Sequence, residues 1–137
     1  MTEAGFTKSV PDEGSYESTS APWPAELRVF KEEGRLEIDF SDGRSCAMSA
    51  EYLRVESPSA EVQGHGPSQK KIVADKRHVK IDAVEPVGHY AIRIVFDDRH
   101  DSGIYSWAYL RELGDTNAER WAAYQAALLY RGLSRDA

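Results

Sequence analysis

Residues 36–48, "LEIDFSDGRSCAM", predict an antiparallel hairpin on their own. From Leu36 to Phe40 apolar residues alternate with acidic ones, which is the period of a half-buried strand. An Asp-Gly pair then supplies a tight turn, and Cys46 and Met48 share one face of the strand that follows. We therefore expect β structure with one apolar face.

The flanking sequence extends this pattern in both directions. "ELRVF" (26–30) predicts the strand before the hairpin, and "VKIDAVEPVGHYAIRIVF" (79–96) predicts two strands around a Pro-Val-Gly turn. In the second of these, one face is expected to carry Tyr90, Ile92, Ile94 and Phe96. "GIYSW" (103–107) predicts a further strand that runs into a helical segment.

Two helical segments complete the predicted fold. Ser49 is a suitable N-cap for a short helix, which Pro58 ends within two turns. From Thr116 onward, apolar residues at helical spacing predict a longer helix that Gly132 stops, with Thr116 and Glu119 as a capping box. The fold class is therefore α+β: a small, mainly antiparallel β domain of about six short strands, with a short helix after strand three and a C-terminal helix.

The chain divides into three parts by composition. Residues 1–24 lack a periodic apolar pattern and are expected to form a flexible tail. Residues 25–115 form the domain, and residues 116–137 form the C-terminal helix. Within the tail, Trp23 is expected to pack against the domain edge, with a docking role as the alternative. The helix face with Trp121 and Tyr124 is expected to pack on the sheet, and pairing with another subunit is the alternative.

Charge and cysteine content exclude several functional classes. The 137 residues carry a net charge of -6, which disfavours binding to nucleic acid or to anionic membranes. No signal peptide or apolar run of membrane-spanning length is present in the sequence, so we expect a cytoplasmic protein. The single cysteine, Cys46, rules out an intrachain disulfide and is expected in the core rather than as a nucleophile.

Motifs for catalysis are missing from the sequence. The four histidines show no metal-ligand spacing, and no nucleophile, base and orienting group can be assembled from the pattern. The Gly-His-Gly run at 64–66 lacks the features of a phosphate loop. A basic cluster is expected to form the solvated lip of a hairpin, or to meet an acidic partner, and consists of Lys70, Lys71, Lys76, Arg77 and Lys80.

Three stretches together resemble a known family. "LEIDFSDGR" (36–44), "YLRVESPSAEVQGHG" (52–66) and "VEPVGHYAIRIVFDDRHDSGIYSWAYLREL" (84–113) resemble the small domain at the N-terminus of gamma-butyrobetaine and trimethyllysine dioxygenases. This domain also occurs as stand-alone bacterial proteins of unknown function (the DUF971 family). The resemblance covers about residues 26–114. Fusions of the domain to scaffold ATPases of iron-sulfur cluster assembly imply a link to iron-sulfur or cofactor metabolism.

The resemblance also implies where relatives hold a structural zinc. Ser57, Ser59 and Val62 stand where the three cysteine ligands would be, and His100 matches the histidine ligand. Hydroxyls and a valine cannot replace thiolates, so the zinc site is not expected here and no cofactor is predicted. His100 is instead expected to link the 56–61 segment to the turn at 97–101 through polar contacts.

These observations lead to a non-enzymatic accessory domain that binds another protein. The dioxygenase chemistry belongs to a separate catalytic domain, so neither catalytic residues nor an enzyme activity are predicted. The alternative is an iron- or zinc-binding protein that uses His100, His65, Glu61 and Asp101. A homo-oligomer through the C-terminal helix also remains open. The expected interaction surface consists of Arg54, Glu56, Ser57, Glu61, His65, His100, Asp101 and Tyr105.

Overall fold

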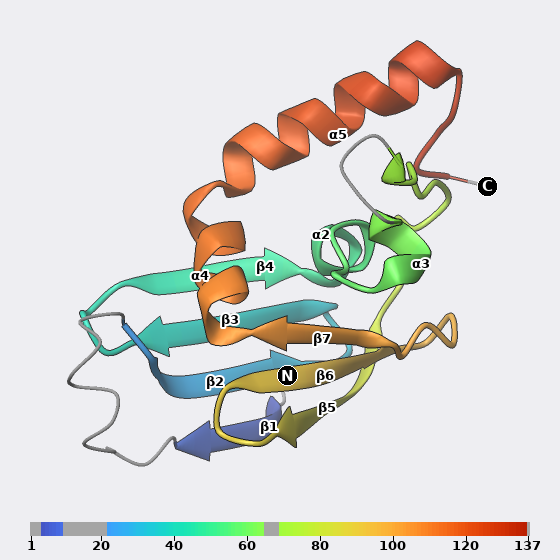
Figure 1. The fold of residues 1–137 in the computed structure, drawn as a ribbon. Coiled ribbons are helices and arrows are strands. Elements are labelled where there is room, and N and C mark those ends of the chain that lie inside the picture. The colour runs from blue at the N-terminus through green and yellow to red at the C-terminus, as the bar shows by residue number, and fades with distance from the viewer. Residues whose placement is uncertain (1–3, 10–21, 65–68, 137) are drawn as a thin grey trace.

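The structure is a computed structural model that describes residues 4–9, 22–64 and 69–136, with residues 4–9 described by their backbone alone. The described residues form two antiparallel sheets and four helices (Figure 1). This confirms the α+β class. His65 and the rest of the Gly-His-Gly run after Gly64 lie outside the described residues.

The first sheet is antiparallel and contains the predicted hairpin. Its strands, in the order in which they pair, are β1 (Ala4–Ser9), β2 (Pro24–Phe30), β3 (Arg35–Phe40) and β4 (Ser45–Ser49). In the register, Ile38 is paired with Leu27 on one side and with Cys46 on the other, so the inward-facing residues stack across the sheet. Gly43 takes a φ of 90° in the turn of the hairpin, a conformation that glycine adopts without strain.

The N-terminal segment differs from the expected tail. Residues 4–9 form β1, which pairs with β2 as an edge strand, with a shift in register between Ala4 and Phe6. The sequence pattern missed this strand because strand pairing is made by backbone groups, which any residue can supply, and residues 4–9 show no apolar alternation. Trp23 lies next to β2, where its backbone exchanges hydrogen bonds with Ser41. It is half-buried just before the start of β2, next to the end of β3.

The second sheet has three strands and follows the predicted order. They are β5 (Ile81–Val87), β6 (Ala91–Phe96) and β7 (Gly103–Ser106). Ile92, Ile94 and Phe96 are buried on one face of β6 as expected. Tyr90 was wrongly assigned to that face: it lies in the turn before β6, and 63% of it is exposed. The Pro-Val-Gly turn extends to this residue, which takes it out of the alternating pattern.

The helices are α2 (Ala50–Val55), α3 (Ala60–Gln63), α4 (Trp107–Asp115) and α5 (Asn117–Arg131). Ser49 caps α2 by accepting a hydrogen bond from the Tyr52 amide, which confirms the short helix after the hairpin. Gly132, with φ 69°, ends α5 as predicted.

The predicted capping box at the start of α5 is wrong. Thr116 makes no side-chain cap, and its hydroxyl donates instead to the Glu112 carbonyl. The reason is that α4 ends at Asp115 and α5 begins at Asn117. The Glu112 carbonyl near the end of α4 accepts from both the amide and the hydroxyl of Thr116, and this contact replaces the cap.

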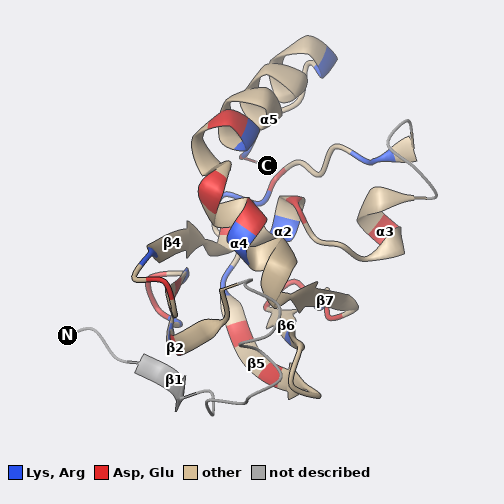
Figure 2. Cartoon of the chain, turned by 60° about the vertical axis from the view of Figure 1, so that its left-hand side comes forward, with Lys and Arg blue, Asp and Glu red and all other residues tan. Residues whose placement is uncertain are grey.

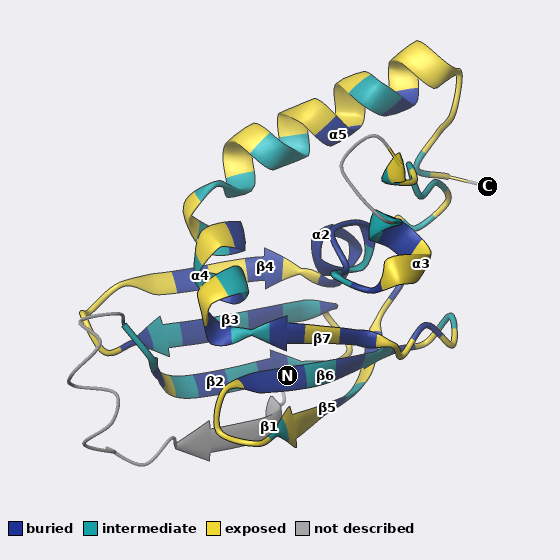
Figure 3. Cartoon of the chain, viewed as in Figure 1, coloured by how far each residue is buried: buried dark blue, intermediate teal, exposed yellow. Residues whose placement is uncertain are grey.

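One core unites both sheets with α2 and α4. Its buried residues come from the inner faces of β2–β4 and β5–β7 and from the two helices, as the dark segments in Figure 3 show. Cys46 belongs to this core, as predicted, and burial raises the pKa of its thiol. A thiol with a raised pKa is a poor nucleophile at neutral pH.

The C-terminal helix does not pack on the sheet as expected. Tyr124 and Leu128 instead form a second, smaller cluster with Val55 of α2 and the segment 72–74. The Tyr124 hydroxyl also donates to the Val73 carbonyl. In Figure 1, α5 accordingly crosses above α2, on the side away from the sheets. Among the described residues, no helix is both long and apolar enough to cross a membrane.

Candidate functional site

The side chains of Ser57 and Glu61, from separate parts of the chain, both contact His100. The Ser57 Oγ lies 2.9 Å from His100 Nε2, and the Glu61 Oε1 lies 3.1 Å from His100 Nδ1. Ser57 follows α2, Glu61 lies in the first turn of α3, and His100 follows β6. We call these three residues the His100 clasp. It joins the 56–61 segment to the turn at 97–101, the link that the sequence predicted for His100.

Local backbone structure sets the position of the serine in the clasp. Ser59 caps α3 through its hydroxyl, while its amide donates to Ser57 Oγ at 3.2 Å. Gly103 lies opposite, and a β-carbon at this residue would come within 2.6 Å of Ser57 Oγ. The start of β7 therefore requires glycine so that the serine can reach the histidine.

His100 is held neutral in this setting. Its side chain is 3% exposed, and burial, followed by the nearby Arg54 charge, lowers its pKa against the opposing effects of Glu61 and Asp98. A neutral imidazole has one donor and one acceptor nitrogen. Donation from Nδ1–H to Glu61 and acceptance at Nε2 from the Ser57 hydroxyl satisfies all three groups.

A second polar cluster lies directly behind the clasp. Asp98 accepts from Arg54 Nε at 2.8 Å, from Lys76 Nζ at 2.6 Å and from the His100 amide at 3.1 Å. Burial alone would raise the pKa of Asp98, but these donors outweigh it and lower the pKa to about 2. Arg54 Nη1 is the one buried side-chain nitrogen or oxygen without a hydrogen-bond partner among residues 22–64 and 69–136.

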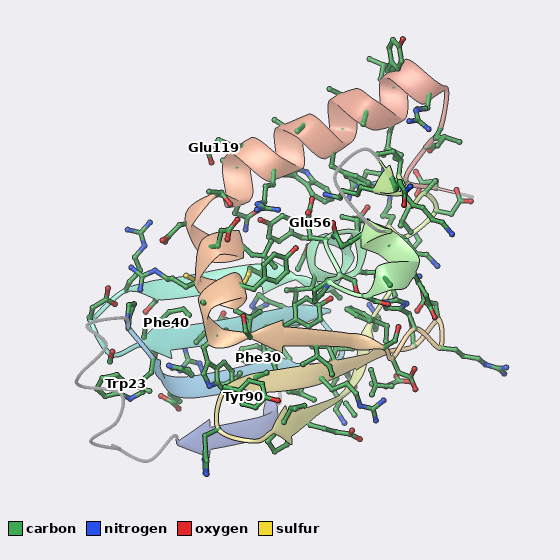
Figure 4. The ribbon with its side chains drawn as sticks, in the orientation of Figure 1. Trp23, Phe30, Phe40, Glu56, Tyr90 and Glu119 are labelled. Carbon is green, nitrogen blue, oxygen red and sulfur yellow. The ribbon has the colours of Figure 1, made fainter. Side chains whose placement is uncertain are left out.

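A third polar contact ties α5 to the end of α2. Glu56 is 4% exposed, and its Oε1 accepts from Lys70 Nζ at 2.8 Å and from Arg120 Nη1 at 3.1 Å. Its backbone carbonyl accepts from the Tyr109 hydroxyl. Figure 4 shows Glu56 between α2 and α5. A buried carboxylate needs such partners, so the pair of cations is part of the helix packing.

Most of the expected interaction surface is buried. Glu56, Ser57, His100 and Tyr105 are at most 5% exposed, and the Arg54 side chain is 12% exposed. These residues hold the fold together and cannot meet a partner directly, which corrects that prediction. Only Glu61 and Asp101 of the described members are exposed.

The predicted basic cluster is not the lip of a hairpin. The segment 70–80 connects α3 to β5 without forming a strand. Lys70, Lys76 and Arg77 pair within the chain, with Glu56, Asp98 and Asp136 respectively. Acidic and basic residues are spread over helices, strands and loops (Figure 2). The three ion pairs neutralise much of the positive charge of the cluster.

The residues at the position where the resemblance implies a zinc site do not fit a zinc ion. Val62 has no donor atom, and the two serines offer neutral hydroxyls. Ser57 Oγ and His100 Nε2 are at hydrogen-bond distance from each other, and His100 Nδ1 is engaged by Glu61. Asp101, a member of the alternative set of metal ligands, pairs with Arg93, with its Oδ2 3.4 Å from Arg93 Nη1. Among the described residues, no group of three potential ligands converges.

The order Ser57–His100–Glu61 is nevertheless that of a nucleophile, a base and an orienting carboxylate, which the sequence analysis did not predict. Residue spacing could not show it, because Ser57 and His100 are 43 positions apart. Ser57, however, is fully buried, and its Oγ already accepts from the Ser59 amide. It lines neither of two hollows on the described surface, one beside Glu51 and one beside Lys70.

Sequence reasoning missed two further features. Glu51 is 5% exposed and binds Arg135 near the C-terminus, beside a hollow of about 430 Å³. At the far end of α5, Leu129 and Tyr130 are 82% and 90% exposed. Only the second feature had a signal in the sequence, the pair of large apolar residues just before Gly132.

Comparison with known proteins identifies the family. The model of the family "Gamma-butyrobetaine hydroxylase-like, N-terminal" matches residues 27–111. The chain belongs to this family. A crystal structure of a DUF971 protein of unknown function from Acidithiobacillus ferrooxidans is 39% identical, with a TM-score of 0.57 over 67% of this chain and 92% of that one. The search of curated proteins returned no match.

Two solution structures cover more of the chain. Each is described as an "NMR solution structure of the protein", is 42% identical and has a TM-score of 0.73. They cover 84% and 85% of this chain, and 90% and 87% of their own. The similarity to these two structures thus covers more of the chain than residues 27–111.

The neutral state of His100 predicts a pH dependence of stability. Well above pH 6.5 the imidazole is uncharged in both the folded and the unfolded chain. Below that pH the unfolded chain takes up a proton that the folded chain resists, because folding lowers the pKa. The free energy of unfolding should therefore fall as the pH drops from about 6.5 to 5.

Urea denaturation of wild type and His100→Gln at a series of pH values measures this effect. The variant should be less stable at pH 7.5 but should lose less stability between pH 6.5 and 5. Asp98 contributes only at lower pH, since its folded pKa of about 2 limits its loss to the range below about 4. If the free energy of unfolding fell equally with pH in the two proteins, His100 would not be held neutral.

Proposed function

We propose that the protein is a non-enzymatic accessory module that inserts the C-terminal end of α5 into an apolar groove of another protein. The supporting observation is the exposed apolar face at this end. Three of the five large hydrophobic residues that are exposed in the described chain lie here: Leu129, Tyr130 and Leu133.

The geometry of α5 suits this role. Its inner face holds the helix on the domain through Tyr124 and Leu128, which leaves the opposite face free of contacts with the described core. Ala126, Leu129 and Tyr130 follow the i, i+3, i+4 spacing of a helix that docks in a groove, and Leu133 lies just past Gly132, where the helix has ended. Apolar side chains grouped in this way mark contact sites more often than isolated ones do.

The proposed pathway and location have other support. The link to iron-sulfur or cofactor metabolism is supported by the family resemblance, and the cytoplasmic location by the single cysteine. The net charge of -6 favours a protein over a nucleic acid as the partner.

A pull-down with paired variants tests the contact. Leu129→Glu combined with Tyr130→Glu should abolish retention of a specific partner, identified by mass spectrometry, because two charges are placed in an apolar interface. Ala118→Glu is the matched control, since it adds a charge to an exposed position near the opposite end of the same helix. It should keep the partner.

Size-exclusion chromatography with light scattering separates this proposal from self-association. The proposal expects a monomer whose mass does not change with the double substitution. A dimer that dissociates on Leu129→Glu with Tyr130→Glu would assign the surface to a second copy of the chain instead. Partner retention by the double variant equal to that of wild type would overturn the proposal.

A second function is favoured by one observation, the Ser57–His100–Glu61 order, which suits acyl transfer or hydrolysis. Burial of Ser57 opposes it, so we expect no labelling of the folded protein by a fluorophosphonate probe. Intact-mass spectrometry measures the labelling. A stoichiometric adduct that is lost in Ser57→Ala, but retained in Ser102→Ala, would make the protein an enzyme.

A further inference from the structure

We propose that the hollow under the start of α5 is a recognition site for an arginine in an extended peptide segment of a partner protein, occupied here by the chain's own Arg135. The site is formed by Glu51 and Trp121 together with residues 75–77. It is separate from the exposed end of α5, which lies beyond Leu128.

The contacts of Arg135 are specific for a guanidinium group. Its Nε and Nη2 donate to the two carboxylate oxygens of Glu51, at 2.8 and 2.7 Å. Its Cζ also lies 5.1 Å from the centre of the Trp121 ring. This paired fork, combined with contact to an aromatic ring, is geometry that lysine cannot reproduce.

The acceptor carboxylate is built into the fold. Glu51 lies in the first turn of α2 and is 5% exposed. Among the described residues, Arg135 is the only hydrogen-bond partner of the Glu51 side chain. A buried carboxylate without a partner is strongly destabilising, so the site requires a cation from some source.

The segment that carries Arg135 is bound like a separate peptide. After α5 ends, the chain turns back, and the Ser134 and Arg135 carbonyls accept from the amides of Asp75 and Arg77, at 3.0 and 3.1 Å. Asp136 adds an ion pair with Arg77. Backbone pairing with one anchored side chain is a common mode of peptide recognition.

Space for a ligand remains with Arg135 in place. The hollow has a volume of about 430 Å³, within the range of about 300–1,000 Å³ that is usual for ligand pockets. Tyr52, Asn117 and Trp121 line it on one side. An incoming segment could exchange with the C-terminal one and also contact this wall.

Fluorescence polarisation tests the proposal with a labelled peptide of residues 132–136, Gly-Leu-Ser-Arg-Asp, carrying a C-terminal amide. Full-length Arg135→Ala should bind this peptide saturably. Wild type should bind it at least about tenfold more weakly, because the tethered segment competes at an effective concentration in the millimolar range. A matched peptide with lysine in place of arginine should also bind Arg135→Ala at least about tenfold more weakly, since the fork is lost.

Two further variants complete the test. Arg135→Ala combined with Glu51→Gln should lose the peptide while keeping the circular dichroism spectrum of the single variant. If Arg135→Ala does not fold, Arg135→Lys replaces it, because it keeps the charge and loses the fork. Leu129→Glu with Tyr130→Glu, added to Arg135→Ala, should leave the affinity unchanged, which keeps this site distinct from the proposed α5 contact.

Several results would overturn the proposal. Equal binding by Arg135→Ala and the Glu51→Gln double variant would show that the carboxylate is not the anchor. Equal affinity for the arginine and lysine peptides would reduce the site to a simple charge contact. No binding by a folded Arg135→Ala would mean that Arg77 or Lys80, which line the same hollow, neutralises Glu51.

Discussion

The hydrogen bonds of His100 hold two parts of the fold that the sheets do not connect. Ser57 and Glu61 follow the first sheet in the chain, whereas His100 lies in the turn between β6 and β7 of the second. Three side chains join these parts with hydrogen bonds. The glycine at 103 leaves room for this contact, and the burial of His100 lowers the pKa of its imidazole.

Buried charges extend the same arrangement outward from the clasp. Arg54 and Lys76 converge on Asp98, and Lys70 and Arg120 converge on Glu56. Each acid lies at a helix end or a turn, and its cations come from the 70–80 connector or from a helix. These pairs therefore attach the connector and α5 to a core that is otherwise closed by apolar packing. Their value lies in positioning, since a buried pair adds little net stability over apolar packing of the same volume.

The sequence predicted those parts of the structure that repeat locally. Alternation identified the strands from Leu27 to Phe96, Ser49 identified α2, and Gly132 identified the end of α5. Prediction from the sequence failed where a contact depends on another element of the fold. The edge strand β1, the altered use of Thr116 and the location of α5 on α2 are all of this kind.

The candidate site shows the same division. The family resemblance brought residues 56–61 and His100 together correctly. It did not show that most of these residues are buried, because burial depends on packing from both sheets. The Glu51–Arg135 pair spans 84 positions, and neither residue belongs to a motif. Such long-range pairs can be found only in the folded structure.

The hydrogen bond between Ser57 and His100 is the direct link between the segment 56–61 and the turn at 97–101. A double-mutant cycle with Ser57→Ala, His100→Gln and the combined variant, measured by urea denaturation at pH 7.5, tests it most directly. We expect a coupling energy of about 1–3 kcal/mol, as for a buried hydrogen bond within a network. Additive effects, with a coupling energy below about 0.3 kcal/mol, would contradict the claim.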